Sequence, residues 1–377
     1  MKTLQIGKYY YPYKGGIENN TKHCCDSLKN DFEVECLVFN TENKTVHEYI
    51  EDVKITRASS LGNFSSQEIS LSFLIEFLKS KPDIIHFHAP NPLVSLYLLL
   101  FHRNIPLVIT HHTDISDDKK FRTVALWIYK KLLKRAVGII SYTNAYASSS
   151  DELKGFENKF VIIPNGTVEQ PFVTTSESIA ESLQLKKETC DNQFTLFFIG
   201  RHVAYKGVEI ILKALIQLPD VHLLIAGAGP ETTSYELFVS QNNLNSRVHF
   251  LGELNNSQKN IAYQACDAVV LPCLNRTESF GQILVEAQLS SKPTIVSNID
   301  TGVREVVTSE TGCFCEIGNV DSFKKAIHLL KTDEELRLRL GRNGYQRAKK
   351  YYVESVTSIR LNQYFKTISN LEQKNDR

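Results

Sequence analysis

A predicted junction between a strand and a helix has the residue types and spacing of a binding site for an anion. A strand ends near Leu271, and Ser279 and Gln282 have the spacing of a capping box that would start a helix. The backbone amides around Phe280 and Gly281 would lie at the positive end of the helix dipole. We therefore expect these amides to bind a phosphate or another anion.

Two glutamates flank this predicted anion site. Glu278 precedes the helix and Glu286 lies within it, eight residues later, which separates the two by roughly 12 Å along the helix axis. One carboxylate could therefore contact each end of an elongated ligand whose phosphates lie at the helix start. A surface glutamate followed by an ordinary helical glutamate would have the same spacing, so the spacing leaves both interpretations open.

A second candidate loop, Gly200–Gly207, directly follows a predicted strand. It contains Arg201 and Lys206 between its two glycines. Two cations suit a diphosphate, and glycines let the backbone approach a ligand closely. Solvated surface charge is the alternative, but the position of the loop at the carboxyl end of a strand favours a binding role.

Two further glycine pairs are candidates for phosphate binding. Gly15 and Gly16 follow the first predicted strand and open a helix, which suits a backbone approach to phosphate or sugar, although a simple turn fits equally well. Gly227 and Gly229 resemble the start of a dinucleotide fingerprint. The third glycine is missing and Pro230 follows, so we exclude a nicotinamide cofactor.

Histidines gather at the predicted strand ends of the first half of the chain. His86 and His88 would share one face of a strand, and His112 and Asp114 follow the next strand. A metal site is conceivable here, but histidines at strand ends more often bond to loops or to substrate. The sequence has no Asp-x-Asp motif. We therefore expect no metal and no other cofactor, with fixed cations and a helix dipole stabilising a leaving group.

The segment Lys119–Arg135 has a basic helical pattern that includes the only tryptophan, Trp127. Such a segment can lie at a membrane interface beside anionic lipid. It can equally be an amphipathic helix that packs its apolar face on a sheet. Both interpretations can hold for different faces of one helix.

The composition is that of a soluble globular protein. Hydrophobic residues make up 42% and charged residues 23%, and the formal net charge of +1 does not favour nucleic acid as the main partner. The eight cysteines lack zinc-site spacing and are typical of buried thiols in a reducing compartment. The N-terminus does not resemble a signal peptide, and no apolar run reaches the ~20 residues that span a bilayer. A cytoplasmic location is therefore expected.

Short apolar runs alternate with helical patterns along the chain, which predicts an α/β fold with doubly wound parallel sheets. The predicted strands are Thr3–Lys8, Val34–Phe39, Ile84–His88, Leu107–Thr110, Gly138–Tyr142, Phe160–Ile163, Thr195–Ile199, Val221–Ala226, Val248–Leu251, Ala268–Leu271 and Pro293–Val296. A polar interval at 166–193 predicts a linker between domains at 1–165 and 194–350. Ligands are expected in a cleft at the carboxyl ends of the strands.

Taken together, the motifs resemble the family 4 glycosyltransferases of the GT-B type, and among them bacterial surface-polysaccharide mannosyltransferases. The matching segments are Tyr9–Pro12, Gly15–Glu18, Ile163–Gly166, Gly200–Gly207, Glu278 to Glu286, and Thr311–Asp321. The resemblance covers nearly the whole chain. It implies two Rossmann-like domains facing across a cleft, the first binding acceptor and the second nucleotide sugar, and a final helix at 351–377 that packs on the N-terminal domain.

The resemblance also assigns roles to individual residues. It implies that Arg201 and Lys206 hold the donor diphosphate, that Glu278 contacts hydroxyls of the donor sugar, and that Glu286 contacts the ribose. Ser279 and the backbone of Phe280 and Gly281 would meet the phosphates or the sugar. Gly15 and Gly16 would approach the diphosphate from the other domain, and His112 would lie near the transferred sugar. The segment at 300–303 departs from the family pattern, which leaves the donor sugar open.

The activity that the resemblance implies is transfer of a hexose from a nucleotide sugar to a hydroxyl group, with retention of configuration. GDP-mannose is the favoured donor, and UDP-hexoses and UDP-N-acetylhexosamines remain alternatives. The expected acceptor is a lipid-linked glycan of O-antigen, capsule or exopolysaccharide synthesis at the inner face of a bacterial membrane. A non-catalytic protein that binds nucleotide sugar or glycan is the alternative of another class.

Overall fold

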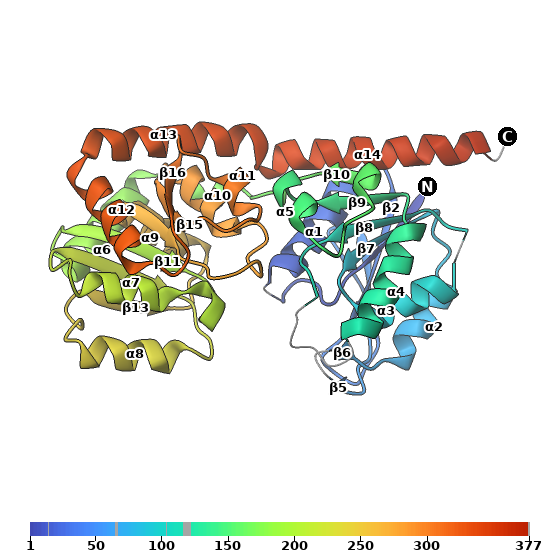
Figure 1. Ribbon diagram of the computed structural model, residues 1–377. Coiled ribbons are helices and arrows are strands. Elements are labelled where there is room, and N and C mark those ends of the chain that lie inside the picture. Colours follow the sequence, from blue (N-terminus) through green and yellow to red (C-terminus); the bar gives the residue numbers. More distant parts are fainter. Residues whose placement is uncertain (14, 65–66, 103, 116–121, 376–377) are drawn as a thin grey trace. The chain divides into compact units, whose positions relative to one another are not determined.

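The computed structural model describes residues 1–13, 15–64, 67–102, 104–115 and 122–375, which form two compact units (Figure 1). The N-terminal unit comprises residues 1–166 and returns with residues 354–377, and the C-terminal unit comprises residues 167–353. Each unit is built around its own mainly parallel sheet with helices on both faces. The predicted α/β class with two doubly wound domains is therefore confirmed.

The sheet of the N-terminal unit has eight strands in the order β10-β9-β8-β7-β1-β2-β4-β3. Only the edge strand β3 runs antiparallel to its neighbour. The strands are β1 (Lys2–Ile6), β2 (Glu33–Phe39), β3 (Val46–Ile50), β4 (Val53–Ala58), β7 (Ile84–Ala89), β8 (Leu107–His111), β9 (Gly138–Ser141) and β10 (Phe160–Ile162). Strands β5 (Asn63–Phe64) and β6 (Gln67–Glu68) pair antiparallel in a separate two-stranded sheet.

Alternate residues of these strands pack into two apolar layers. One layer joins Leu4, Ile6 and Phe87 to the helices α2 (Leu71–Lys79), α3 (Pro92–Leu100) and α4 (Arg122–Arg135). The other joins Cys36, Val38 and Ile84 to α1 (Gly16–Leu28) and α14 (Glu354–Asn375). A short helix, α5 (Asn144–Ser149), follows β9. Burial on both faces explains why strands such as β8 and β9 are mostly apolar in sequence.

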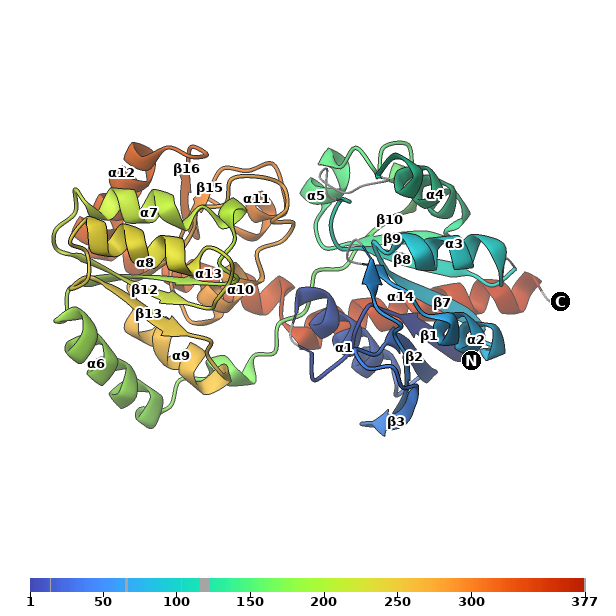
Figure 2. The ribbon, with the colours of Figure 1, turned by 90° about the horizontal axis from the view of Figure 1, so that it is seen from below.

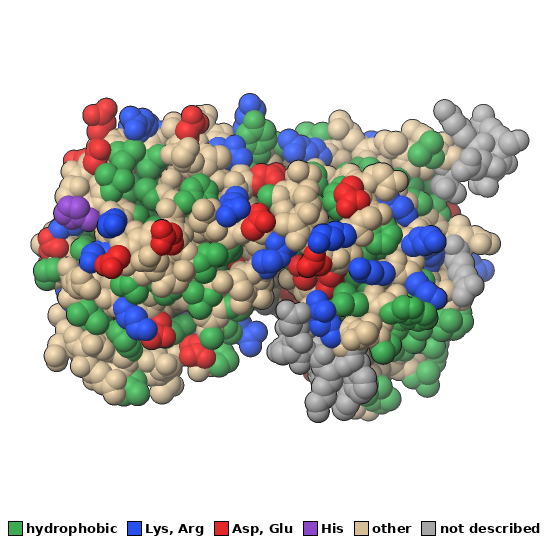
Figure 3. Space-filling model, viewed as in Figure 1, with side chains coloured by type: hydrophobic (Ala, Val, Ile, Leu, Met, Phe, Trp, Pro, Cys, Tyr) green, Lys and Arg blue, Asp and Glu red, His purple; other side chains and the backbone are tan. Residues whose placement is uncertain are grey.

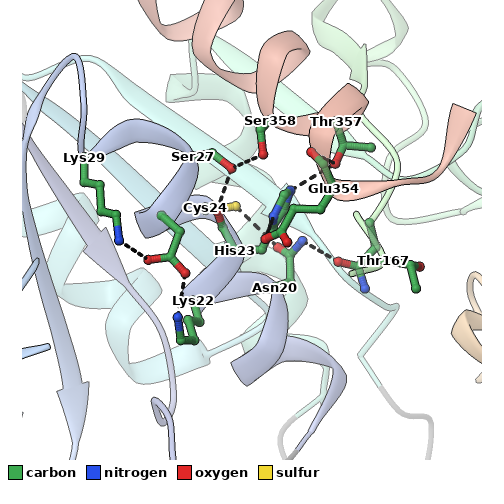
Figure 4. A network of polar contacts seen from close by, with 12 residues as sticks. Asn20, Lys22, His23, Cys24, Ser27, Lys29, Thr167, Glu354, Thr357 and Ser358 are labelled. Carbon is green, nitrogen blue, oxygen red and sulfur yellow. Dashed lines mark hydrogen bonds and ion pairs between the residues drawn. The ribbon is translucent and has the colours of Figure 1, made fainter. Parts of the chain in front are cut away.

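Helix α14 is joined to α1 by polar contacts as well as by apolar packing (Figure 4). The His23 ring contacts the Glu354 carboxylate through Nδ1 at 2.7 Å and the buried Thr357 hydroxyl through Nε2 at 3.0 Å. The hydrogen bond from His23 lowers the pKa of the Glu354 carboxyl. Ser27 and Ser358 hydroxyls lie 2.8 Å apart. The last helix thus belongs to the N-terminal unit, although it begins at Glu354 rather than at 351.

The sheet of the C-terminal unit has six parallel strands in the order β13-β12-β11-β14-β15-β16. Figure 2 labels β12 and β13 toward one side of this sheet and β15 and β16 toward the other. The strands are β11 (Phe194–Ile199), β12 (Val221–Ala226), β13 (Val248–Gly252), β14 (Ala268–Leu271), β15 (Thr294–Ser297) and β16 (Gly312–Cys315). The helices are α6 (Ser176–Cys190), α7 (Val208–Leu215), α8 (Thr232–Gln241), α9 (Asn256–Ala265), α10 (Gln282–Leu289), α11 (Val303–Val306), α12 (Val320–Thr332) and α13 (Glu334–Tyr351).

The segment predicted as a linker at 166–193 differs in the structure. The division between the units falls between Gly166 and Thr167, and most of the segment is the helix α6, which packs against α9 within the C-terminal unit. Thr175 and Ser178 form a capping box at its start. The high content of polar residues reflects the exposed faces of this helix rather than a missing element. The sequence pattern also did not predict strands β3, β4, β5, β6 and β16.

Within the described residues, no helix is both long enough and apolar enough to cross a bilayer.

Candidate active site

Two loops of the C-terminal unit meet because their strands are neighbours. Strand β11 pairs with β14 in parallel register, so both strands end at the same edge of the sheet. The loop after β11 contains the short 3-10 turn Ala204–Lys206, and the loop after β14 leads into α10. Residues that are more than seventy positions apart in sequence are thereby brought together, as the prediction of a site at the strand ends required.

Gly207 allows the two loops to approach closely. Its backbone is left-handed, with φ at 67°, and a Cβ atom at this position would lie 2.1 Å from the Pro272 carbonyl oxygen. The Leu274 amide also donates a hydrogen bond of 2.8 Å to the Tyr205 carbonyl. Only glycine tolerates both the conformation and the contact, so Gly207 fixes the loop that presents Lys206.

Lys206 and Glu278 form an ion pair between the two loops. Each side chain is only 12% exposed. Burial by itself lowers the pKa of the Lys206 ammonium, but Glu278, Cys273 and Tyr205 oppose this effect, and the net pKa is raised. The Cys273 sulfur lies 3.9 Å from the same Glu278 oxygen, and burial raises the pKa of this thiol. The site therefore holds a fixed positive charge that its own carboxylate balances.

The start of α10 differs from its prediction. The helix begins at Gln282, and Gly281 at its N-cap is left-handed and makes no side-chain cap, so the predicted capping box of Ser279 and Gln282 is wrong. Gln282 instead donates to the Thr167 hydroxyl at 2.6 Å. The Gly281 amide donates to Glu278 at 2.9 Å. The helix N-terminus thus binds a carboxylate of its own chain, which shows that an anion is favourable there.

Glu286 lies buried on the second turn of α10 and contacts helix α9 with both of its oxygens. Lys259 lies 2.8 Å from one oxygen, and the Tyr263 hydroxyl donates to the other at 2.9 Å. Burial and the neighbouring carboxylate raise the pKa of the Tyr263 hydroxyl. The carboxylate is therefore held in one orientation by two donors that the sequence pattern did not reveal.

The remaining predicted residues of the C-terminal unit have different surroundings. Arg201 is exposed on the loop after β11. The Phe280 side chain is buried and packs edge-to-face against Tyr352, with ring centroids 5.9 Å apart. The Ser279 carbonyl accepts a hydrogen bond of 2.9 Å from the Gly302 amide. The segment that departs from the family pattern, at 300–303, therefore contacts the loop that precedes α10.

In the N-terminal unit, the predicted glycines open helix α1, and His86 and His88 lie within β7 rather than at its end. Gly15 is the N-cap of α1, and Gly16 is its first residue, as expected for glycines that open a helix. Strand β7 contains both His86 and His88, whose ring centroids are 4.5 Å apart, so the prediction of a shared strand face is confirmed. His112 directly follows β8 and is buried.

The His112 ring is held by two side chains. His88 Nδ1 lies 3.1 Å from His112 Nε2, and the Tyr142 hydroxyl contacts Nδ1 on the other side. Burial is the main cause that holds the pKa of His112 well below its usual value, and burial lowers the pKa of His88 to about 3. Both rings are therefore neutral near pH 7 and can exchange hydrogen bonds without bringing charge into the site.

Asp114 does not join His86 and His88, as the conceivable metal site required. It lies beside His111, whose Nε2 is 3.2 Å from the carboxylate. His86 and His88 instead lie near Cys24, close enough for one ligand atom of each to fall within 4.8 Å of the others.

Residues 119–121 of the predicted basic helix lie outside the described residues, and the rest forms α4. Tyr129, Leu132 and Leu133 are buried against the sheet, so the amphipathic-packing interpretation is confirmed for this face. Arg135 donates to carbonyls of Leu98 and His102 and is therefore structural. The opposite face is exposed.

Two doubly wound units, each with polar side chains at the carboxyl ends of its parallel strands, define the GT-B class of glycosyltransferases. Solved structures agree on the fold. A sucrose-phosphate synthase from Thermosynechococcus elongatus superposes with a TM-score of 0.81 at 18% identity, covering 98% of this chain and 99% of that one. Anabaena HepE, solved in complex with UDP-glucose, gives a TM-score of 0.80 at 18% identity over 97% and 100% of the two chains.

Sequence comparison identifies the family. The model described as Glycosyltransferase Family 4 matches residues 14–169, and the model described as Glycosyl transferases group 1 matches residues 181–347. An O-antigen chain mannosyltransferase C from Escherichia coli is 28% identical over 92% of this chain and 93% of its own length. The D-rhamnosyltransferase WbpZ from Pseudomonas aeruginosa is 30% identical over 76% and 75%. The chain therefore belongs to the family 4 glycosyltransferases.

Proposed function

We propose that this glycosyltransferase moves a hexose from a nucleoside diphosphate sugar to a hydroxyl group with retention of configuration. The observation that carries the proposal is the buried Lys206–Glu278 pair beside the start of α10. A diphosphate would bring negative charge to Lys206, and the sugar hydroxyls would bring donors to Glu278. Each partner of the pair can thus exchange an internal contact for one with the donor.

The proposed chemistry needs stabilisation of a departing diphosphate and no cofactor. Lys206, Arg201 and the amides at the start of α10 would stabilise the charge that develops on the leaving oxygen. The acceptor oxygen would attack the anomeric carbon from the face that the diphosphate leaves, and the leaving oxygen would accept the proton of the acceptor hydroxyl. The neutral His112 would hydrogen-bond to the transferred sugar without competing for the diphosphate.

GDP-mannose is the favoured donor. The two relatives named above transfer mannose and D-rhamnose, which is the 6-deoxy form of mannose, so both names point to the manno configuration. UDP-hexoses and UDP-N-acetylhexosamines are the alternatives, because the segment at 300–303 departs from the usual family pattern next to the donor loop.

A thermal-shift screen without added metal tests the donor. GDP-mannose, UDP-glucose, UDP-galactose and the UDP-N-acetylhexosamines are compared at equal concentration, because a ligand that binds only the native state raises its stability. GDP-mannose should raise Tm most, and Lys206→Ala should reduce the shift. A larger rise in Tm with a UDP sugar would identify that sugar as the donor in place of GDP-mannose. No rise in Tm with any of these nucleotide sugars would count against the proposed donor site at Lys206 and Glu278.

The alternative of another class is a protein that binds nucleotide sugar without turning it over. Glu278→Gln separates the two, because it keeps the size of the side chain and removes its charge. An enzyme should lose turnover while far-UV circular dichroism remains unchanged. If the wild type bound the donor but formed no product with any glycan acceptor, the result would support the alternative that the protein is a non-catalytic binding protein.

We further propose that the acceptor is a lipid-linked glycan of O-antigen, capsule or exopolysaccharide synthesis, and that the exposed face of α3 and α4 contacts the membrane. This face combines Leu96, Leu100, Val124 and Trp127 with Lys130, Lys131 and Lys134, and all seven side chains are exposed. The two helices pack side by side, and green and blue side chains lie close together over this part of the molecule (Figure 3). Apolar side chains beside lysines suit an anionic lipid surface.

Vesicle flotation tests this membrane contact. A variant with Lys130→Glu, Lys131→Glu and Lys134→Glu should lose binding to anionic vesicles, and Trp127→Gln should weaken it. A control with Lys325→Glu, Arg339→Glu and Lys350→Glu makes the same change in net charge on exposed residues of the C-terminal unit. Equal loss of vesicle binding in both triple variants would show that binding depends on net charge alone. Unaltered binding in the first variant would overturn the proposal.

A further inference from the structure

Cys190, His222 and His249 form a cluster in the C-terminal unit that the proposed transfer reaction does not use. Cys190 is the last residue of α6, His222 is the second residue of β12, and His249 is the second residue of β13. One potential ligand atom from each lies within 4.8 Å of the others. The three residues are too far apart in sequence to resemble a zinc motif, so only the fold reveals the cluster.

The spacing of the two imidazoles fits a shared ion. His222 Nδ1 lies 3.3 Å from His249 Nε2. Two nitrogens at the usual zinc distance, about 2.05 Å, would be about 3.3 Å apart around a tetrahedral ion. The rings are nearly parallel, with an interplanar angle of 12°, and their centroids are 5.6 Å apart. The two nitrogens already have the separation that a shared tetrahedral ion requires, so the ion would replace the hydrogen bond between the two rings.

The ligand set suits a metal that takes thiolate and imidazole ligands. A cysteine sulfur and two imidazole nitrogens are groups that zinc binds in proteins. The carboxylate of Asp191 lies near both rings, and the Arg247 guanidinium lies near His222. His222 also forms a hydrogen bond with the Thr189 backbone. A ring nitrogen bonded to a backbone carbonyl is the usual partner of a metal-bound imidazole.

We propose that Cys190, His222 and His249 bind a zinc ion. Binding replaces the thiol proton of Cys190, which passes to solvent, and forms three bonds to the ion. A water molecule or the Asp191 carboxylate takes the fourth position. His249 is partly exposed and provides the entry path, whereas the other two ligands are buried. The mixed sulfur and nitrogen ligands favour zinc over magnesium or calcium.

The site is structural rather than catalytic. His222 and His249 lie at the start of their strands, whereas Lys206 and Glu278 follow the ends of parallel strands in the same sheet. The ion would join the end of α6 to β12 and β13, three elements that are distant in sequence. Zinc binding should therefore stabilise the unit without changing the affinity for the donor.

Zinc titration of the full chain, first stripped with a chelator, tests the proposal. Competition with a chromophoric chelator should show one equivalent bound with a Kd below micromolar. Cys190→Ser and His249→Gln should each weaken binding at least 100-fold, whereas Cys313→Ser and His328→Gln should leave it unchanged. Cobalt in place of zinc should give a sulfur-to-metal charge-transfer absorption that Cys190→Ser abolishes.

Thermal unfolding provides a second measurement. Zinc should raise the Tm of the wild type and of both control variants, and it should not raise the Tm of His249→Gln. Because His249 is partly exposed, its substitution should leave the protein folded, which the Tm without zinc verifies. No zinc bound by the wild type at micromolar concentration would overturn the proposal. Equal binding by wild type, Cys190→Ser and His249→Gln would overturn it as well.

Discussion

The C-terminal unit keeps a charged pair at the ends of its strands, whereas the N-terminal unit keeps a cluster of neutral histidines. Lys206 retains its proton because Glu278 opposes the effect of burial. His88 and His112 have no such carboxylate among the main influences on their pKa, and burial keeps both rings uncharged. Equally dry surroundings thus give opposite outcomes, and the neighbouring charge decides between them.

This difference is consistent with the proposed transfer reaction. A diphosphate leaving group needs fixed positive charge, which the C-terminal unit would supply. Hydroxyl groups of a sugar need donors and acceptors of hydrogen bonds, which the neutral imidazoles would supply without attracting phosphate. Breaking the charged pair should therefore affect turnover most, and a change to His88 should appear mainly in the dependence of stability on pH.

The largest effect is expected for Lys206→Ala. If Lys206 stabilises the leaving group as proposed, its loss should lower kcat by about 10²- to 10³-fold. The variant also leaves Glu278 buried without its partner, which should reduce the free energy of unfolding by about 3 kcal/mol. Initial rates with donor in excess and urea unfolding measure the two effects. Lys213→Ala, on the exposed face of α7, should change neither.

A different result would alter the comparison. If Lys206→Ala lost stability but kept its kcat, the pair would be a structural element of the loops. The double variant Lys206→Met with Glu278→Leu distinguishes these cases, because it removes both charges and should recover much of the stability while remaining inactive.

The predicted parts of the fold and site are those that depend on local pattern. Buried parallel strands such as Val221–Ala226 are continuous apolar runs, and all eleven predicted strands are present within a residue or two at most ends. Strand β4 alternates buried and half-exposed residues, and β3 is an exposed edge, so neither has this pattern. The helix α6 was missed because its exposed faces gave it the composition of a linker.

The candidate site was likewise predicted only where it depends on local sequence pattern. The sequence placed Lys206 and Glu278 on loops at strand ends, but their pairing depends on the adjacency of β11 and β14, which no local pattern contains. Lys259 and Tyr263 bind Glu286 from another helix and were not found for the same reason. The predicted cap at Ser279 failed because Glu278 takes the Gly281 amide, and Gly281 adopts a left-handed conformation.

The neutral histidines should make the N-terminal unit sensitive to acid. The pKa of His88 is about 3 in the folded state and ~6.5 in an unfolded chain. As pH falls through this window, the unfolded state therefore binds more protons than the folded state, and the protein loses stability. Between pH 7 and 4.5 this residue alone should remove about 2 to 3 kcal/mol from the free energy of unfolding. The pKa values of His86 and His112 are lowered as well and act in the same direction.

Urea unfolding of wild type and His88→Gln at pH 7 and pH 4.5 measures this effect. The difference between the two pH values should be smaller in His88→Gln, whereas His47→Gln, at an exposed position on β3, should behave as the wild type. An identical pH dependence in all three proteins would mean that His88 takes up its proton in the folded state. The contrast between the charged and neutral sites would then fail.

A smaller effect is expected for Glu286→Gln. If this carboxylate contacts the ribose, the substitution should raise KM for the donor about tenfold, or about 1.4 kcal/mol, and leave kcat within about twofold, because the contact is the same before and during the reaction. Glu253→Gln, at an exposed position, is the control. A fall in kcat at unchanged KM would instead show that Glu286 makes an interaction that forms only in the transition state.

The smallest effect is expected for Arg201→Gln. Arg201 is exposed, so solvent and salt screen its attraction for a diphosphate, in contrast to the buried Lys206. At low ionic strength the substitution should raise the donor KM about threefold, and at about 0.15 M salt the difference from wild type should shrink further. A loss of kcat as large as that of Lys206→Ala, independent of salt, would show that donor binding buries Arg201 against the leaving group. The two cations would then act as one unit, and the double variant would be little worse than either single variant.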